Sequence, residues 1–488
     1  MKKLLYPFAF ALTVFLILYS CSAEEEDTTP PSTVQQPTPE PEPTAPTQYT
    51  LTVTAGDGGT VSTEGGTYDE GTEITITATP DEGYVFIGWS ENQEIFSNSI
   101  TVEIDNNKTL TPLFIMMPEV NTNTLWEKQG FTSAIWTTRY NNSCIEYAPK
   151  ELGLFEFKKS LIDYLNTGAN TIIIDWHLRL EEGLDENGAP NGSIIFTDSA
   201  HDLDYIGNKI ELAKSFGLEV WIKPIVLTQT NWQTMKPKEP ATWFENYIAR
   251  IDDLLNNIDS SSVDALLITN ELCEITTDTD YIENWEGLIQ HFRDNYSFSL
   301  GINVQGVEPN LESGYNEWKN VSHLTDKLDF IGLSTYVAYG LTNGTEYPSE
   351  DELYQGWFSN NEGKDMIKGL NDYIEQSPIP VYITELGARP TPNLRINYDN
   401  QIISTTTQDN FFKATLRVFK ENVTELRGVF GYCWSEADVH PCKLPNGEFD
   451  SKRLVDGESY QNIEEAKTWI INYNSSINTF KTFFSNSN

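Results

Sequence analysis

The chain has 488 residues, of which 39% are hydrophobic and 12% aromatic, enough for a large apolar core and for roughly two or three domains. Its 31 lysine and arginine residues stand against 72 aspartate and glutamate residues, which gives a formal net charge of −41. So acidic a surface repels nucleic acid and anionic membranes, so neither is an expected partner, and a neutral polymer is an easier ligand.

Residues 1–20 have the pattern of an export signal. Lys2 and Lys3 precede an apolar run over residues 4–18 that is too short for a membrane-spanning helix, and Cys21 follows it. The segment resembles a bacterial lipoprotein signal, which implies that Cys21 is lipidated, becomes the mature N-terminus and anchors the protein at the cell outer membrane. A plainly cleaved signal peptide, in which Cys21 has no such role, is the alternative.

Residues 21–48 are predicted to be a linker without a core of its own. An acidic run directly after Cys21 resembles the export tag of surface lipoproteins in Bacteroidetes-type bacteria, which implies exposure at the cell surface. Residues 28–47 alternate proline with threonine and glutamate, a composition typical of a stiff spacer. The linker would hold the rest of the chain away from a membrane.

Residues 49–117 are predicted to form a small all-β module. Three segments, 49–54, 73–78 and 99–104, alternate apolar or β-branched side chains with polar ones. The stretch from Thr79 to Ser90 resembles the divergent InlB B-repeat family of bacterial surfaces, which implies a spacer or adhesion domain. We expect Phe86 and Trp89 in the core of this module, with a sugar-stacking platform as the alternative.

Residues 118–488 alternate short apolar runs with amphipathic segments, of which 154–168, 202–217 and 243–257 are expected helices. Strands this continuously apolar need both faces buried, so the pattern predicts an α/β fold, a (β/α)8 TIM barrel. A doubly wound open sheet is the alternative, but no glycine-rich phosphate loop follows any run. The predicted strands are 130–136, 171–179, 219–226, 265–271, 299–305, 329–336, 381–387 and 428–435.

Polar and aromatic side chains gather at the carboxyl ends of these runs, where barrel enzymes place their active sites. Flat rings can stack on sugar faces, while amide, hydroxyl and charged groups can bond sugar hydroxyls. The ring comprises Trp136, Arg139, Asp175, Trp176, His177, Arg179, Lys223, Asn270, Glu271, Asn303, Gln305, Tyr336, Glu385, Trp434 and Glu436.

Two members of this ring, Glu271 and Glu385, end the fourth and seventh predicted strands. A pair of carboxylates that face one another across a barrel is the equipment for cleaving a glycosidic bond. Asn270 with Glu271, and Glu385 at the seventh strand end, resemble clan A of the retaining glycoside hydrolases. The sequence therefore predicts a glycoside hydrolase that acts on an oligosaccharide or polysaccharide.

Four stretches are similar to glycoside hydrolase family 113, which is mainly endo-β-1,4-mannanases. They are Gly130-Phe-Thr-Ser-Ala-Ile-Trp136, Gly217-Leu-Glu-Val-Trp-Ile-Lys-Pro224, Asp329-Phe-Ile-Gly-Leu-Ser-Thr-Tyr336 and Tyr382-Ile-Thr-Glu-Leu-Gly387. The chain departs from the family at Ile268-Thr-Asn-Glu271, which replaces a Gly-x-Glu ending. It also departs at residues 337–364, which are predicted to be an enlarged loop.

The resemblance implies a role for each residue near the cleft. Glu271 would be the general acid and base, and Glu385 the nucleophile that forms a glycosyl-enzyme. Asn270 would bond a sugar hydroxyl, Tyr336 would hold Glu385 in place, and Trp434 would form the floor of the sugar-binding subsite. The remaining expected substrate contacts are Trp136, His177, Lys223, Arg179 and Asn303, with an ion-pair role inside the barrel as the alternative for His177, Lys223 and Arg179.

Cofactor chemistry has no support in the sequence. We expect no cofactor and no metal, because the chain has no zinc motif and no EF-hand loop, and its five histidines are scattered. A serine hydrolase elbow is also absent. A disulfide between Cys433 and Cys442 is one reading, and a buried free thiol at Cys433 is the other.

The leading hypothesis is therefore a surface-anchored, monomeric, retaining endo-β-1,4-mannanase that cleaves β-mannan or glucomannan. A β-glucanase or xylanase with the same machinery is the first alternative, because the contacts that read the 2-hydroxyl are not visible in a sequence. A surface glycan-binding protein on an inactive barrel is the second. Loss of either glutamate would have favoured that last reading, and both are present.

Overall fold

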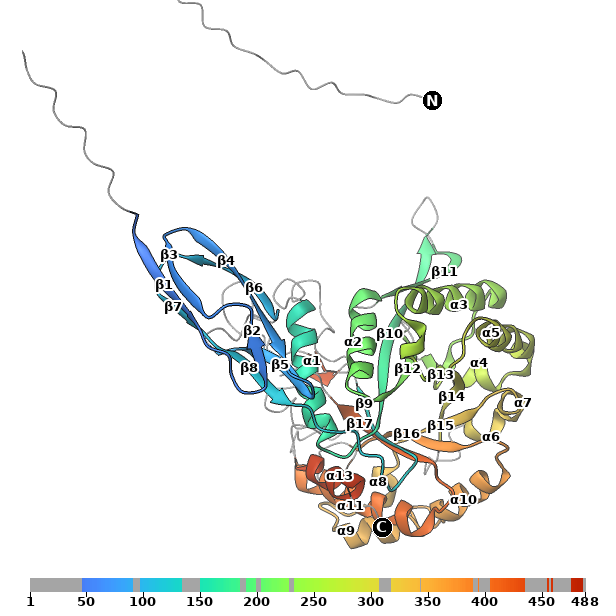
Figure 1. Ribbon diagram of the computed structural model, residues 1–488. Helices are drawn as coiled ribbons and strands as arrows, with labels where there is room; N and C mark the ends of the chain where they lie inside the picture. The colour runs from blue at the N-terminus through green and yellow to red at the C-terminus, as the bar shows by residue number, and fades with distance from the viewer. Residues whose placement is uncertain are drawn as a thin grey trace, which may run out of the picture. The chain divides into compact units, whose positions relative to one another are not determined.

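The computed structural model describes a small β module and a parallel barrel (Figure 1). No helix in the described part of the chain is both long enough and apolar enough to cross a membrane. The described residues are 46–90, 97–133, 150–184, 190–198, 203–227, 232–306, 317–342, 344–388, 394, 404–434, 454–455, 458–459 and 475–485.

The β module consists of short strands in three small sheets, ordered β3-β1-β7, β2-β4-β6 and β5-β8. The strands predicted at 49–54, 73–78 and 99–104 correspond to β1, β4 and β6. The bounds are β1 (Gln48–Val53), β2 (Gly59–Val61), β3 (Gly65–Asp69), β4 (Thr72–Pro80), β5 (Tyr84–Trp89), β6 (Ser99–Ile104), β7 (Lys108–Leu110) and β8 (Pro112–Met116).

Phe86 and Trp89 lie in the core of the β module. Their rings meet edge to face with centroids 5.7 Å apart, and Trp89 has no exposed surface. The indole Nε1 of Trp89 donates a hydrogen bond to the carbonyl oxygen of Ser97 at 3.1 Å, so its polar group is satisfied inside the module. These two aromatic residues are therefore core residues and do not form a sugar-stacking platform.

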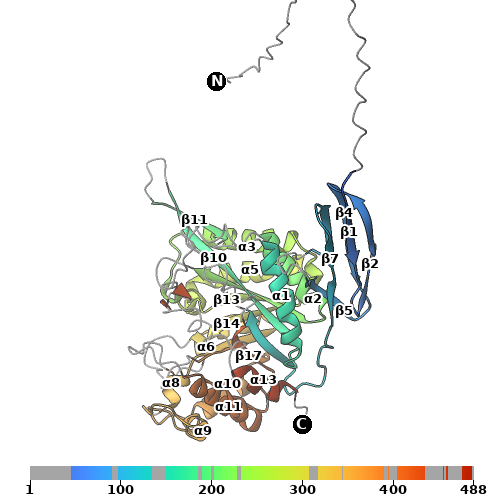
Figure 2. The same cartoon turned by 90° about the vertical axis from the view of Figure 1, so that its left-hand side faces the viewer.

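The larger part of the chain is a closed barrel of eight parallel strands (Figures 1 and 2). Strand β9 pairs with β17 on one side and with β10 on the other, which closes the sheet and excludes the doubly wound alternative. The fold is a (β/α)8 TIM barrel, as predicted. Its strands are β9 (Lys128–Ser133), β10 (Thr171–Leu184), β12 (Glu219–Leu227), β13 (Ala265–Asn270), β14 (Ser299–Gln305), β15 (Phe330–Thr335), β16 (Val381–Leu386) and β17 (Gly428–Trp434).

Most of the described residues of the barrel strands are buried, because helices cover the outer face and side chains fill the inside. Every residue of β13, β15 and β16 is buried, which is the reason these segments read as continuous apolar runs. The aromatic side chains of Trp221, Phe330, Tyr382 and Phe430 fill the amino-terminal half of the barrel. Trp221 lies at their centre, with ring centroids 4.6 to 5.3 Å from the other three.

Helices surround the barrel, and α3 shows how the sequence specifies one of them. Pro240 begins α3 at a position where a missing backbone N–H costs nothing, and Trp243, Tyr247 and Ile251 recur at helical spacing on its buried face. The helices are α1 (Lys150–Leu165), α2 (Leu203–Ser215), α3 (Pro240–Asn256), α4 (Cys273–Thr277), α5 (Ile282–Asn295), α6 (Glu317–Asn320), α7 (Ser322–Thr325), α8 (Ala338–Leu341), α9 (Glu350–Gly356), α10 (Met366–Gln376), α11 (Thr405–Asn422) and α13 (Ser476–Ser485).

Two features differ from the sequence prediction. Residues 337–364, expected as a loop, contain α8 and α9, and a capping box between Ser349 and Glu352 starts α9. Strand β10 also runs past the barrel and pairs in antiparallel fashion with β11 (Pro190–Asp198), which was not predicted. Figure 1 shows β11 beside α3.

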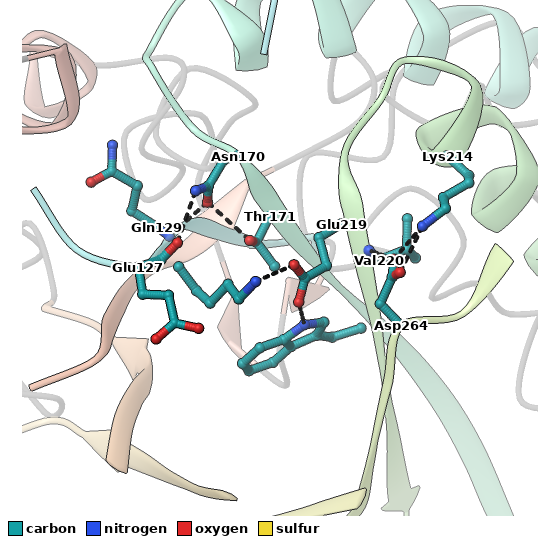
Figure 3. Close-up of polar contacts among 10 residues, drawn as sticks. Glu127, Gln129, Asn170, Thr171, Lys214, Glu219, Val220 and Asp264 are labelled. Atoms are coloured by element: carbon teal, nitrogen blue, oxygen red, sulfur yellow. Dashed lines mark hydrogen bonds and ion pairs between the residues drawn. The ribbon is translucent and has the colours of Figure 1, made fainter. Parts of the chain in front are cut away.

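Polar side chains tie the strands together at the amino-terminal end of the barrel, opposite to the predicted site (Figure 3). The Glu219 carboxylate accepts from the indole of Trp221 at 2.8 Å and pairs with Lys128. The Asp264 carboxylate accepts from Lys214 at 2.6 Å and from the backbone N–H of Val220 at 2.8 Å. This end of the barrel is therefore closed by ion pairs and aromatic rings, as expected of the face of a TIM barrel that serves stability.

Candidate active site

The carboxyl ends of the eight strands meet at one rim, and their register brings residues from different strands together there. The neighbouring pairs are Asp175 with Lys223, Asn270 with Asn303, and Ser334 with Glu385. Glu271 follows β13 directly. The parallel register thus gathers carboxylates, a lysine and amides at one end of the barrel.

Both carboxylate oxygens of Glu385 are held by protein donors. The hydroxyl of Tyr336 donates to Oε2 at 2.5 Å, and the ammonium of Lys223 contacts Oε1. The side chain is nearly buried, with 4% of the residue exposed. Because both donors stabilise the ionised carboxylate, the structure presents Glu385 as an oriented anion.

Lys223 is a completely buried cation shared by two carboxylates. Its Nζ lies 3.2 Å from Oδ1 of Asp175 in addition to its contact with Glu385. Burial alone would lower the pKa of Lys223, but the charges of Asp175 and Glu385 outweigh it and raise the pKa, so the ammonium stays charged. Burial raises the pKa of Asp175 to about 7, against the attraction of Lys223.

Glu271 lies at the end of β13 in a left-handed backbone conformation, with φ of 52°. This conformation is uncommon for residues other than glycine and often marks functional sites. The backbone N–H of Glu271 donates to the carbonyl oxygen of Asn303 at 3.0 Å, and Nε2 of Gln233 donates to its Oε2 at 3.3 Å. The strand therefore ends in a fixed turn that carries the carboxyl group of Glu271.

The environment of Glu271 favours its protonated form. Burial and, to a smaller extent, the negative charge of Glu385 raise the pKa of Glu271 to about 8, against a hydrogen bond from Ser334 that lowers it. No cation among the described residues forms an ion pair with Glu271. The site therefore contains two carboxyl groups in unlike states, one protonated near neutral pH and one held as an anion.

A network of amide and hydroxyl groups supports the two glutamates from below. Nδ2 of Asn303 donates to Oδ1 of Asn270 at 2.6 Å and to the hydroxyl of Ser334 at 2.9 Å, and its Oδ1 accepts from Thr384. A Cβ at Gly332 would lie 2.5 Å from the hydroxyl of Thr384, so only glycine leaves room for this network. The bond from Asn303 to Oδ1 fixes the amide group of Asn270, whose nitrogen is a hydrogen-bond donor.

Three of the expected substrate contacts lie deeper than the sequence indicated. Lys223 and Asn303 have no exposed surface, and their polar groups are used by Glu385, Asp175 and the network around Asn270. In this structure the two residues hold other side chains of the site, which for Lys223 is the ion-pair alternative stated above, and their contact with substrate stays a prediction. His177, on β10, is 9% exposed.

Several expected residues lie outside the part of the chain that the structure describes. They are Cys21, Trp136, Arg139, Cys442 and Glu436. Strands β10 and β17 include Arg179, Cys433 and Trp434, but their side chains are not described. The substrate contacts of Trp136, Arg179 and Trp434, and a disulfide between Cys433 and Cys442, therefore stay predictions.

Sequence reasoning missed residues that reach Glu271 from outside the predicted strand ends. Gln233 comes from a short 3-10 helix, Trp232–Thr234, and Cys273 is a buried free thiol on α4. Glu317, on α6, is completely buried and adds a negative charge near Glu271. A polar residue that ends an apolar run can be assigned to a strand end from the sequence. Gln233, Cys273 and Glu317 lie on short helices and follow no such run.

No group of three or more histidine, cysteine, aspartate or glutamate side chains in the described ranges is arranged to hold a metal ion. Two carboxyl groups in unlike protonation states, with an oriented anion and a proton donor at the rim of a (β/α)8 barrel, are the equipment of a glycosidase.

Comparison with protein-family models gives two matches. Residues 49–121 match the divergent InlB B-repeat domain, and residues 158–446, more than half of the chain, match glycoside hydrolase family 113. Comparison with curated protein sequences finds no match.

Solved structures similar to this chain include three family 113 enzymes. Two structures of β-1,4-mannanases are 14% and 16% identical, each over 74% of this chain and 98% or 99% of the other, with TM-scores of 0.48 and 0.49. A β-mannanase from Alicyclobacillus acidocaldarius is 15% identical over 74% of this chain and 97% of its own, with a TM-score of 0.45.

The closed barrel, the unlike carboxyl pair and the family match together define the class of this protein as a glycoside hydrolase. The chain belongs to glycoside hydrolase family 113. Its β module is a divergent InlB B-repeat domain.

Proposed function

We propose that the protein is a retaining endo-β-glycanase and that its substrate is β-1,4-mannan or glucomannan. The observation that carries the mechanism is the unlike environment of Glu271 and Glu385 at one rim of the barrel. The choice of mannan is supported by membership of family 113, since solved members of that family are described as β-1,4-mannanases.

In the first half of the reaction, an oxygen of Glu385 attacks the anomeric carbon and forms a covalent bond to it. The bond from that carbon to the leaving oxygen breaks, and the proton of Glu271 passes to the leaving oxygen. In the second half, the Glu271 carboxylate takes a proton from water, the water oxygen attacks the anomeric carbon, and Glu385 leaves. Two displacements at one carbon return the sugar to its original configuration.

The charge of Glu385 couples the two halves of this reaction. Glu271 has a raised pKa partly because Glu385 beside it is negative. When Glu385 forms its covalent bond to the sugar, that charge is lost, and the pKa of Glu271 falls. Glu271 is then ready to act as a base at the step at which a base is required.

The neighbouring groups have matching roles. Tyr336 orients Glu385 through its hydroxyl, which donates at 2.5 Å, and Lys223 neutralises the buried anion in the resting state. The amide of Asn270, oriented by Asn303, donates to a sugar hydroxyl near the reacting carbon. Preorganised donors of this kind are most effective where charge develops in the transition state.

The test of this function is incubation with mannan, glucomannan, xylan, laminarin and cellulose, followed by oligosaccharide profiling and proton NMR of the first product. We expect oligosaccharides of mixed length from mannan or glucomannan, with the new reducing end in the β configuration. Cleavage of xylan or a glucan in place of mannan would move the proposal to another β-glycanase. An inverted product would contradict the retaining mechanism.

The pH dependence of kcat/KM is expected to follow Glu271. The pKa of Glu271 is about 8, so below this pH the proton donor is present, and above it the donor ionises and activity falls. The measurement is kcat/KM against pH on an oligosaccharide and on a dinitrophenyl glycoside, whose leaving group needs no proton. The decline above pH 8 should be present with the first substrate and absent with the second. The same decline with both would assign it to another group.

We also propose that the protein is lipid-anchored and surface-exposed through Cys21, a location supported by the apolar run that ends at this residue and the acidic, proline-rich linker behind it. The expected result of Cys21→Ala is a protein that takes up no labelled palmitate and is soluble or unprocessed. Wild-type protein should be labelled in the same cells. Labelling of the variant at the wild-type level would contradict the lipoprotein assignment.

A further inference from the structure

Glu317 is an unusual residue for its place, because it is a carboxylate with no exposed surface and no ion-pair partner among the described residues. Burial raises the pKa of Glu317 to about 7, against three hydrogen bonds that oppose the shift. An isolated buried carboxylate is costly, so a protein that keeps one near its active site has a use for it more often than not.

The three donors to Glu317 come from two different elements, strand β14 and helix α4. The backbone N–H of Gln305, at the end of β14, donates to Oε2 at 2.8 Å, and the thiol of Cys273 lies 3.4 Å from the same oxygen. The hydroxyl of Thr276 donates to Oε1. Glu317 on α6 therefore joins the end of β14 to α4, the helix that begins two residues after Glu271.

The same cluster reaches the backbone of Glu271. The Sγ of Cys273 lies 3.6 Å from the carbonyl oxygen of Glu271 and 3.8 Å from Oε1 of Gln305. On the other side of Glu271, its N–H is bonded to the carbonyl oxygen of Asn303 on β14. The left-handed turn at Glu271 is thus held between β14 and the segment that Glu317 fixes.

We propose that Glu317 is a positioning residue for the general acid, which holds the segment carrying Glu271 against the end of β14 and keeps its carboxyl group in place. This inference rests on the proposed function of Glu271. The charge of Glu317 acts in the same direction, because it raises the pKa of Glu271 and so helps to keep the acid protonated.

A residue that acts through the acid should matter only when the acid is needed. We expect Glu317→Gln to lower kcat/KM by about 10-fold to 100-fold on phenyl β-mannobioside, since misplacement of a catalytic group by about 1 Å can cost that much. On dinitrophenyl β-mannobioside, which leaves without a proton, the first step should change less than about 3-fold. The decline of kcat/KM at high pH should also move to lower pH, because the charge that raises the pKa of Glu271 is gone.

The matched control is Asp409→Asn. Asp409 is a buried carboxylate on α11 that accepts from Thr479 on α13 at 2.5 Å and forms an ion pair with Lys413 at 2.7 Å, and none of these bonds involves an active-site residue. Its replacement should lower the melting temperature but leave the ratio of activities on the two glycosides unchanged. That ratio is independent of the folded fraction. If Glu317→Gln fails to fold, Thr276→Val removes one donor of the cluster and should show the same selectivity at smaller size.

A double-mutant cycle completes the test. If Glu317 acts through Glu271, Glu317→Gln should add no further loss in a Glu271→Ala background. Two results would overturn the inference. One is an equal loss of kcat/KM on both glycosides, and the other is a double variant in which Glu317→Gln lowers kcat/KM by the same factor as it does in the wild-type enzyme. If Glu271→Ala and Glu385→Ala both kept wild-type turnover, the proposed function itself would fail, and the two failures are thereby distinguished.

Discussion

Replacement of Glu385 by alanine or glutamine is expected to lower turnover by several orders of magnitude on every substrate. The oxygen that forms the glycosyl-enzyme is lost, and the two described groups that contact it, the ammonium of Lys223 and the hydroxyl of Tyr336, act as donors to Glu385 and not as nucleophiles. An activated leaving group cannot compensate, since bond formation at the anomeric carbon fails. The measurement is kcat on polymer, oligosaccharide and dinitrophenyl glycoside with the same enzyme preparation.

The control for this prediction is Glu283→Gln, at the exposed start of α5, which changes charge in the same way at a distance from the site. It should keep wild-type turnover. Thermal melting shows whether the Glu385 variants are folded. A folded Glu385→Gln enzyme with turnover near the wild-type value would exclude Glu385 as the nucleophile.

The barrel could be predicted from the sequence because its strands are buried on both faces. Such strands appear in the sequence as continuous apolar runs. All eight were located within a few residues of their ends; for example, β13 was predicted as residues 265–271 and β16 as residues 381–387. Strand β11 was missed because it lies outside the barrel, where no continuous apolar run marks a strand. It pairs with the part of β10 that extends past the barrel, where the polar run Arg179-Leu-Glu-Glu-Gly183 replaces the apolar pattern.

The candidate site was predicted in part. The placement of Glu271 and Glu385 at strand ends could be predicted, because each is a polar residue at the end of an apolar run. The depth of Lys223 and Asn303 could not, because it depends on the stagger of neighbouring strands around the barrel, which a single sequence does not contain. The left-handed turn at Glu271 and the arrival of Glu317 from α6 are likewise products of tertiary structure.

Glu271→Ala is expected to fail in a different way from Glu385→Ala. Proton transfer is lost, so turnover of polymer should fall by roughly 100-fold to 10,000-fold, which is the usual contribution of a general acid or base. A dinitrophenyl glycoside should still react with Glu385 in the first step. Because no base then activates water, the glycosyl-enzyme should accumulate, and a burst of dinitrophenol followed by a slow phase should be observed.

Azide can distinguish the two roles, because it occupies the space left by whichever carboxylate is removed. In the Glu271→Ala enzyme, azide should attack the glycosyl-enzyme from the face that water uses and give a β-glycosyl azide with restored turnover. In the Glu385→Ala enzyme, azide should attack from the opposite face, in place of the nucleophile, and give an α-glycosyl azide. Proton NMR of the two products assigns each configuration. An α product from the Glu271 variant together with a β product from the Glu385 variant would exchange the roles of the two residues.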